Sequence, residues 1–480
     1  MKLAEIETLV QNASAEIKQG RTIGILGQPW RATITAAGDV YPWEDARPIR
    51  WYVAADDRWH APADEVAVRQ RSVDGAPVFE TRVRIPGGDV IQRIWVASGR
   101  QGSVALMMEF ENDSPMAIAI AIDRVGLLVS RPVAVRANSG EWPAPGLDLP
   151  TEPTVIPVGH RTSARAAVVV ADPRSDQDIA EFADWLPVAR GWVALSERAS
   201  SFTIPDLRDG RRVDELIVAE RTENALIAFP DDEPDYSDGF FGTPDEAVTW
   251  LVARREIKRM DLGEADPINI AGAIEAIARA VRRQKLSVPR ALEGFRSAVY
   301  LLGPGQERAR KDLGKVVAKS MGLKNVSLMA MLNGSQSGSK RSQSMIEPGG
   351  ERVRSIVSEV EEEFVSMSDD NVLTLLPAGF KTERLGVQFE VHGIAVGVSH
   401  RVSFAVRWHG ANAAVLWEIE GPVGLELRSG VDRSWSSQQA TGEALWLVEG
   451  VPLAALAVPS GTDAPTASSP LTGEGDLSFS

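Results

Sequence analysis

Short runs rich in Val, Ile, Thr and aromatic residues follow one another from residue 21 to about residue 172. Turn-forming residues such as the Asp74-Gly75 pair separate these runs. The runs with the length of a β-strand are residues 78–85, 89–97, 104–111 and 116–122. Such regular spacing predicts an antiparallel β-sandwich over residues 21–172. A short helix is expected before it, over residues 1–20.

After residue 173 the hydrophobic period becomes that of helices. One helical stripe carries four aliphatic residues: Ile270, Ile274, Ile277 and Val281. Another helix is expected to begin at Thr243, because threonine caps helices, Pro244 suits the first helical position and Glu246 completes the start signal. We expect six or seven helices in a helical domain over residues 173–330, packed as antiparallel pairs.

The rest of the chain changes character three times. Residues 331–350 are rich in Gly and Ser and predict a flexible linker. A helix is expected over residues 351–370, a β-region over 371–455 and a disordered tail over 456–480. The whole order predicts an α+β multidomain protein with an N-terminal antiparallel β-sandwich, a central region of paired helices and a C-terminal β-region.

Residues 401–420 alternate between apolar and polar side chains and predict a hairpin that turns at residues 410–411. One register pairs apolar residues with each other and Arg or Ser with Glu: Phe404 with Trp417, Val406 with Val415, Arg401 with Glu420 and Ser403 with Glu418. Trp408 and Trp417 then lie on the apolar face. We expect both to pack in the core.

Charge narrows the classes of partner. The formal net charge is −15 and the isoelectric point is about 5.0, which argues against nucleic-acid binding, because neutralising phosphates needs a basic surface. Basic residues such as Arg254, Arg255 and Lys258 nevertheless gather in the middle of the chain. Solvated helix faces explain them, and docking against an acidic domain or partner is the alternative.

Several kinds of site are excluded or not expected. The sequence has no cysteine, which excludes disulfides, thiolate metal sites and cysteine nucleophiles. Its five histidines lack paired metal-ligand spacing, so we expect no metal and no other cofactor. No apolar run approaches the roughly 20 residues that span a bilayer, and the first residues lack a signal-peptide core. A cytoplasmic protein without membrane contact is expected.

Two segments combine aromatic, basic, acidic and imidazole side chains. Flat aromatic faces beside directional polar groups suit a sugar. The candidate ligand-binding residues are Trp51, Asp56, Asp57, Arg58, Trp59 and His60 in the first segment and Arg407, His409 and Glu418 in the second. We expect the two segments to lie close together in the fold. The alternative is that these side chains only hold their own backbone.

Several stretches of sequence carry a family resemblance: RWYVAADDRWH at 50–60, ETRVRIPGGD at 80–89, ENDSP at 111–115, RWHG at 407–410 and LWE at 416–418. The chain resembles a group of uncharacterised actinobacterial proteins related to the six-hairpin glycosidases, which include glucoamylase-like and glycogen-debranching enzymes. The resemblance implies a β-sandwich followed by an (α/α)6 toroid, with carbohydrate as the ligand class.

A complete toroid does not fit into this chain. Twelve helices at usual lengths need roughly 250 to 350 residues, and only about 155 lie between residues 175 and 330. We therefore expect an incomplete toroid.

Three functions follow from these observations. The first is a carbohydrate-associated protein resembling a reduced six-hairpin glycosidase, which binds an oligosaccharide or glucan without a complete hydrolytic centre. The second is an active glycoside hydrolase, of the glucan-debranching or glucoamylase type, that uses a pair of loop carboxylates. The third is a non-catalytic structural or protein-interaction module. Catalytic residues cannot be assigned, but the loop carboxylates to consider are Asp206, Asp209, Glu223, Asp231, Asp232, Glu233, Asp235 and Asp238.

Overall fold

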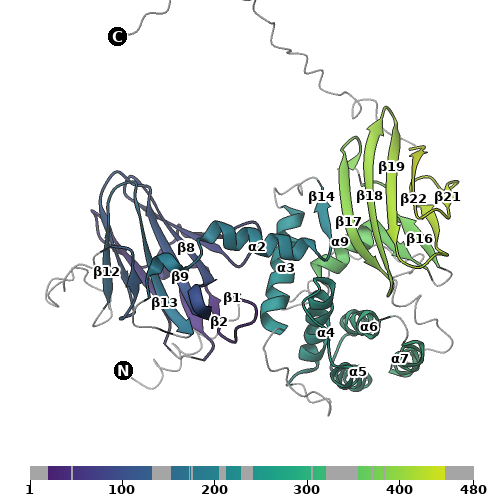
Figure 1. Cartoon of the computed structure of the whole chain (residues 1–480), viewed down its shortest axis with the longest axis horizontal. Coiled ribbons are helices and arrows are strands. Elements are labelled where there is room, and N and C mark those ends of the chain that lie inside the picture. The colour runs from purple at the N-terminus through teal and green to yellow at the C-terminus, as the bar shows by residue number, and fades with distance from the viewer. Residues whose placement is uncertain are drawn as a thin grey trace, which may run out of the picture.

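The computed structural model shows a mixed α+β fold in which helices lie between two groups of strands (Figure 1). It describes residues 20–44, 47–131, 153–171, 173, 177–204, 212–228, 242–303, 306–320, 355–368, 371–381 and 384–448. The helix expected over residues 1–20, the linker over 331–350 and the tail over 456–480 therefore lie outside the described residues, apart from residue 20.

The N-terminal unit consists of three antiparallel sheets built from residues 21–171. The first holds β1 (Arg21–Gly24), β2 (Arg31–Ile34) and β3 (Val40–Pro42). The second has the order β12 (Thr154–Val158), β10 (Ile118–Ile122), β4 (Trp51–Ala54) and β5 (Trp59–His60). The third has the order β11 (Leu128–Val129), β13 (Ser163–Ala171), β9 (Val104–Asn112), β8 (Gly88–Ser98), β7 (Phe79–Ile85) and β6 (Arg69–Ser72).

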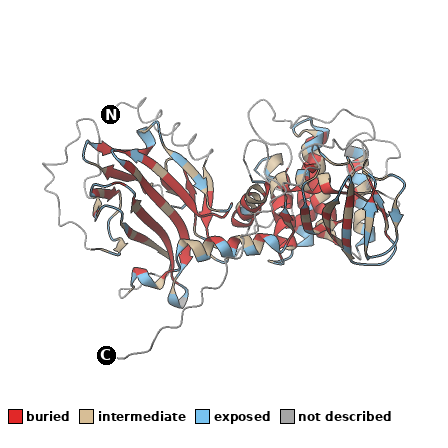
Figure 2. Ribbon diagram, turned by 90° about the horizontal axis from the view of Figure 1, so that it is seen from above, coloured by how far each residue is buried: buried red, intermediate tan, exposed pale blue. Residues whose placement is uncertain are grey.

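The expected antiparallel strands are confirmed, and the four strand-length runs match β7 to β10 within two residues. Strand alternation sends side chains from all three sheets into one core, among them Ile34, Val53 and Ile94. A turn closes the β7–β8 hairpin at Gly87, whose φ of 79° favours glycine. Figure 2 shows these strands as largely buried.

A row of alternating charges crosses the other face of the six-stranded sheet. It contains Arg71, Glu80, Arg93, Glu109 and Arg165, one from each of five neighbouring strands. The ion pairs along it measure 3.1, 3.1, 3.1 and 2.7 Å. Directly opposed opposite charges stabilise neighbouring strands, so the row fixes the strand register together with the core.

Seven α-helices lie in the described part of the chain: α2 (Trp185–Glu197), α3 (Val213–Ala228), α4 (Pro244–Arg259), α5 (Pro267–Arg282), α6 (Val288–Leu302), α7 (Glu307–Ser320) and α9 (Ile356–Phe364). Six of them fall between residues 173 and 330, within the predicted six or seven. The predicted start at Thr243 is confirmed, because its side chain accepts a hydrogen bond from the backbone N–H of Glu246. The described helices are fewer than the twelve of a complete toroid.

The C-terminal unit contains two sheets. The first has the order β14 (Ser201–Thr203), β17 (Phe389–Val396), β18 (His400–His409), β19 (Asn412–Glu420) and β22 (Thr441–Trp446). The second has the order β15 (Val365–Met367), β16 (Val372–Leu375), β20 (Glu426–Ser429) and β21 (Ser436–Ser437). The predicted C-terminal strands are thus present, joined by β14, which lies between α2 and α3, and by β15, which directly follows α9.

The predicted hairpin is confirmed residue by residue. β18 and β19 pair in the expected register, with Phe404 opposite Trp417. Trp417 is 6% exposed, and its ring lies over Gly442 on β22, where an added Cβ would come within 2.6 Å of a ring carbon. Trp408 departs from the prediction because it is only half-buried: it lies near the end of β18, packs on Phe380 and donates its N–H to the Val387 carbonyl.

We expect Trp417→Ala to lower the free energy of unfolding by about 3–5 kcal/mol, because it removes a large ring from the core of the C-terminal unit. Chemical denaturation measures this loss. Leu416→Ala is the control, since Leu416 is 46% exposed on the opposite face of the same strand, and its effect should stay within about 0.5 kcal/mol. Equal effects of the two substitutions would contradict the packing described here.

Candidate functional site

The first predicted cluster, residues 50–60, contributes its tryptophans to the core. Trp51 is 1% exposed, donates its indole N–H to the Ala37 carbonyl at 3.0 Å and lies 5.5 Å from the Phe110 ring. Trp59 is buried with Tyr52 in a small separate cluster. Neither ring is available to a ligand.

The charged residues of this cluster bind one another. His60 is 3% exposed, and its two ring nitrogens lie 3.0 Å from Asp57 and 2.9 Å from Glu65. Arg58 forms an ion pair with Glu65 at 2.6 Å, and its hydrogen bond lowers the pKa of Glu65. Asp56 is exposed. These contacts join side chains around the β4–β5 turn to one another.

The second cluster lies on the β18–β19 hairpin. Arg407 forms an ion pair with Glu390, while His409 and Glu418 are exposed. The expectation that the two clusters lie close together is wrong. β18 and β19 belong to the C-terminal unit, β4 and β5 to the N-terminal unit, and helices separate the units (Figure 1). The paired charges have local partners, with Arg58 and His60 on Glu65 and Arg407 on Glu390.

One candidate carboxylate of the hydrolase hypothesis, Glu223, can be placed, and it lies within α3 and not on a loop as expected. It accepts hydrogen bonds from the backbone N–H and the hydroxyl of Thr22 and lies 3.6 Å from Arg21. It therefore joins α3 to β1. The other seven candidates, Asp206, Asp209, Asp231, Asp232, Glu233, Asp235 and Asp238, lie outside the described residues.

The described part of the chain contains a buried charge network that the sequence did not reveal. It consists of Arg221, Arg255, Arg259, Glu256, Glu293 and Glu361, from helices α3, α4, α6 and α9. Burial this complete is rare for arginine and glutamate unless they are paired. The three positive and three negative charges balance.

Arg221 is the most enclosed cation of this charge network. Its side chain and that of Glu256 are both 0% exposed, and they pair at 3.0 Å. Arg221 also donates to the backbone carbonyls of Ser196 and Ser200, at 3.0 and 2.7 Å, and to the Ser200 hydroxyl. The single side chain thus connects α3 to α4 and to the chain that leads into β14.

Arg255 and Arg259 extend the charge network to the other helices. Arg255 pairs with Glu256 at 2.9 Å and Glu293 at 3.3 Å. Arg259 pairs with Glu256 at 3.1 Å and donates to both carboxylate oxygens of Glu361, at 2.6 and 2.7 Å. Both of these bonds come from the same nitrogen, Nη2, and hydrogen bonds between two ionised groups are stronger than those between neutral ones.

The charge network sets the protonation of its members. Burial alone would raise the pKa of Glu256, but Arg259, Arg255 and Arg221 outweigh it and lower that pKa far below the ordinary value. Glu361 raises the pKa of Arg259 against the opposing effect of burial. Glu220 lies in a different environment, where burial raises its pKa, and it accepts a hydrogen bond from the backbone N–H of Ile356 at the start of α9.

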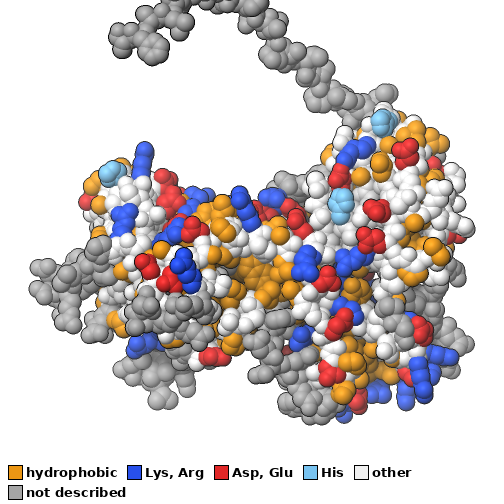
Figure 3. Space-filling view, viewed as in Figure 1, with side chains coloured by type: hydrophobic (Ala, Val, Ile, Leu, Met, Phe, Trp, Pro, Cys, Tyr) orange, Lys and Arg blue, Asp and Glu red, His pale blue; other side chains and the backbone are white. Residues whose placement is uncertain are grey.

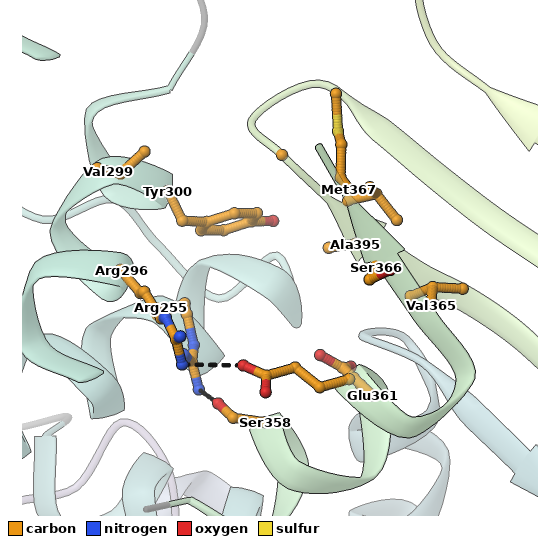
Figure 4. A pocket seen from close by; sticks show the side chains of 13 residues that line it. Arg255, Arg296, Val299, Tyr300, Ser358, Glu361, Val365, Ser366, Met367 and Ala395 are labelled. Atoms are coloured by element: carbon orange, nitrogen blue, oxygen red, sulfur yellow. Dashed lines mark hydrogen bonds and ion pairs between the residues drawn. The ribbon is translucent and has the colours of Figure 1, made fainter. Parts of the chain in front are cut away.

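A pocket of about 160 Å³ adjoins this charge network (Figure 4). We call it the junction pocket, because α4, α6, α9, β15 and the end of β17 border it. Its lining residues are Arg255, Arg296, Val299, Tyr300, Ser358, Glu361, Glu362, Val365, Ser366, Met367, Ala395, Val396 and Gly397. Figure 4 shows the Tyr300 side chain extending from α6 across the pocket towards Met367 on β15.

Some polar groups of the junction pocket already have hydrogen-bond partners, and one does not. Arg255 donates to the Ser358 hydroxyl at 3.1 Å, and Arg296 pairs with Glu362 at 2.9 Å. The Tyr300 hydroxyl makes no hydrogen bond with the described residues, and burial raises its pKa, so it keeps its proton at neutral pH. It is a donor and acceptor available to a ligand.

The sequence did not reveal this site, because charged residues normally indicate a solvent-exposed surface. Arg255 belongs to a run expected to form solvated helix faces, yet it is buried. The alternative, docking against an acidic domain or partner, is closer to what the structure shows. The acidic partners of these arginines, however, lie on α4 itself and on the neighbouring helices α6 and α9. The only signal in the sequence is the spacing of Arg255, Glu256 and Arg259 on α4, which places two arginines near one carboxylate but does not show burial.

Two comparisons with known proteins found no relative. No family model matches the chain, and no curated protein matches it significantly. Among the described residues, no group of three or more His, Asp or Glu side chains could hold a metal ion. No described helix has the length and apolar character needed to cross a membrane.

Glu256→Gln is expected to flatten the dependence of stability on pH between about pH 5 and pH 3. The pKa of Glu256 is lower in the folded than in the unfolded chain. Its carboxylate therefore stabilises the fold above the unfolded pKa, and this contribution is lost as pH falls, by up to about 1.4 kcal/mol per pH unit. The variant lacks this loss, although it is less stable at neutral pH because three arginines lose a partner.

Urea denaturation of both proteins from pH 3 to pH 6 tests this prediction. Glu307→Gln is the matched control, because Glu307 is exposed and its pair with Arg310 lies on the surface. A Glu256→Gln protein with the same acid slope as the wild type would show that Glu256 does not titrate as the charge network requires.

Proposed function

We propose that the protein binds a carbohydrate in the junction pocket and does not hydrolyse it. The observation that carries the proposal is the Tyr300 ring with its unoccupied hydroxyl beside Arg255, Ser358 and Glu361. An aromatic ring next to directional donors and acceptors matches a sugar, which has apolar C–H faces and a rim of hydroxyl groups.

The size of the junction pocket limits what enters it. A volume of about 160 Å³ equals that of about five water molecules in the liquid. It suits one sugar ring and is too small for several. An oligosaccharide or glucan would therefore place its terminal residue in the pocket and leave the rest of its chain outside.

The state of the carboxylates supports binding without hydrolysis. Glycoside hydrolysis needs two free carboxyl groups, one of them with a raised pKa so that it acts as an acid. Both carboxylates of the junction pocket are held by arginines, Glu361 by Arg259 and Glu362 by Arg296. Neither is placed to act as a general acid.

The proposal includes the relationship suggested by the sequence. The chain is then a reduced form of the six-hairpin glycosidases, with an incomplete toroid between its two β-units, and it works in the cytoplasm. Its lack of cysteine fits a reducing compartment, where disulfides are rare.

Tyr300→Ala is expected to weaken binding of a glucan oligosaccharide roughly three- to tenfold, because an aromatic contact contributes about 0.5–1.5 kcal/mol. A glycan array identifies the sugar, and titration calorimetry measures the dissociation constants. His409→Ala is the control, since His409 is exposed on the β18–β19 hairpin, and it should bind like the wild type.

Release of reducing sugar is measured in the same samples, and we expect none. Release would overturn the non-hydrolytic part of the proposal and favour a glycoside hydrolase. A folded wild-type protein that binds no glycan on the array would overturn the proposal as a whole and favour a structural or protein-interaction module.

A further inference from the structure

A second hollow, larger than the junction pocket and separate from it, lies between α5, α6 and α7. Its volume is about 790 Å³, within the roughly 300–1,000 Å³ typical of ligand pockets. It shares no lining residue with the junction pocket. Figure 3 shows apolar side chains among charged ones in this part of the molecule.

This helical groove is long and apolar. α5 lines it from Pro267 to Arg282, and Gln306 and α7 line it as far as Lys319, along most of the lengths of both helices. At 1.5 Å per residue, these faces extend for about 20 Å. The apolar residues lining the groove are Ala265, Pro267, Ile270, Ala271, Ile274, Ala278, Leu301, Leu302, Ala309, Leu313 and Val316. The shape fits an extended chain better than a compact ring.

The two long walls of the helical groove run in the same direction. Lys258 donates to the Leu301 carbonyl at 3.2 Å and pairs with Glu264 at 2.7 Å. It therefore brings the segment before α5 to the end of α6, and α7 begins only a few residues after that end. Both walls start at this end of the groove, so both finish at the other end, where Arg282 and Lys319 are the last lining residues.

Three acidic and three basic residues line the helical groove, but the acids are all paired and two of the bases are not. Each lining acid has a basic partner: Glu264 has Lys258 at 2.7 Å, Glu275 has Arg279 at 3.8 Å and Asp312 has Lys315 at 2.7 Å. Arg282 and Lys319 are exposed and have no acidic partner among the described residues. Cations are common at helix C-termini, but these two line the groove and share the end opposite Lys258.

We propose that the helical groove binds an extended apolar molecule with one anionic end, such as a long-chain carboxylate. Its chain lies along the aliphatic side chains of α5 and α7, and its negative group lies between Arg282 and Lys319. The apolar walls provide affinity through burial. The two cations orient the ligand and select for charge.

The test uses the full chain and cis-parinaric acid, an 18-carbon carboxylate whose fluorescence rises on burial. We expect saturable binding, with the methyl ester of the same acid binding at least tenfold more weakly. Arg282→Glu combined with Lys319→Glu should weaken binding of the acid at least tenfold. The matched control is Arg283→Glu combined with Lys311→Glu, which changes the net charge equally at exposed residues outside the groove and should leave binding unchanged.

A filling substitution, Ala271→Trp, tests the position of the ligand. Ala271 is exposed and lines the helical groove from α5, so the added ring should block binding while circular dichroism stays unchanged. Three results would overturn the proposal: no saturable binding by the folded wild type, an equal loss in both double variants, or a wild-type dimer that Ala271→Trp converts to monomers. The last result would show a second copy of the chain in the groove. Failure of this test would leave the carbohydrate proposal untouched, because the two sites share no residue.

Discussion

Burial of Arg221 and Glu256 is the constraint on which the arrangement of the helices and the C-terminal unit depends. Both side chains are 0% exposed, and removing such ions from water costs several kcal/mol each. Only partners in fixed positions offset this cost, and those partners come from α3, α4 and α9, while Arg255 extends the charge network to Glu293 on α6. A shift of any one helix would leave a charge buried without its partner, so the helices hold one another in place.

The same charge network positions the C-terminal sheets. α9, which carries Glu361, continues directly into β15, and the Ser200 hydroxyl bound by Arg221 immediately precedes β14. β18 adds a third connection, since Arg401 donates to the backbone carbonyls of Arg198 and Arg259 at 3.0 and 3.4 Å. β15 and β17 form one wall of the junction pocket, and the charge network thus fixes the position of this wall. On the other side, Arg31 of β2 donates to the Leu226 carbonyl at 2.8 Å and ties α3 to the N-terminal unit.

The sequence predicts those parts of the fold in which local pattern decides the structure. The β18–β19 register follows from the sequence because a slip of one residue would place Phe404 and Trp417 on the polar face. The start of α4 follows from the chemistry of Thr243 and Pro244. The charge network could not be predicted, since Arg221 and Glu361 lie 140 positions apart and charged residues normally indicate a surface. For residues 50–60 the composition suggested a ligand, but His60, Arg58 and Glu65 satisfy one another.

Native-state hydrogen exchange tests most directly whether the charge network joins the helices and the C-terminal sheets into one cooperative unit. If it does, the slowest amides of α4 and of β18 exchange through the same opening, with equal free energies and equal dependence on denaturant. Arg221→Met then lowers both free energies by the same amount. Amides of α4 that exchange at a clearly lower free energy than those of β18, or a variant that destabilises only one of the two, would contradict this account.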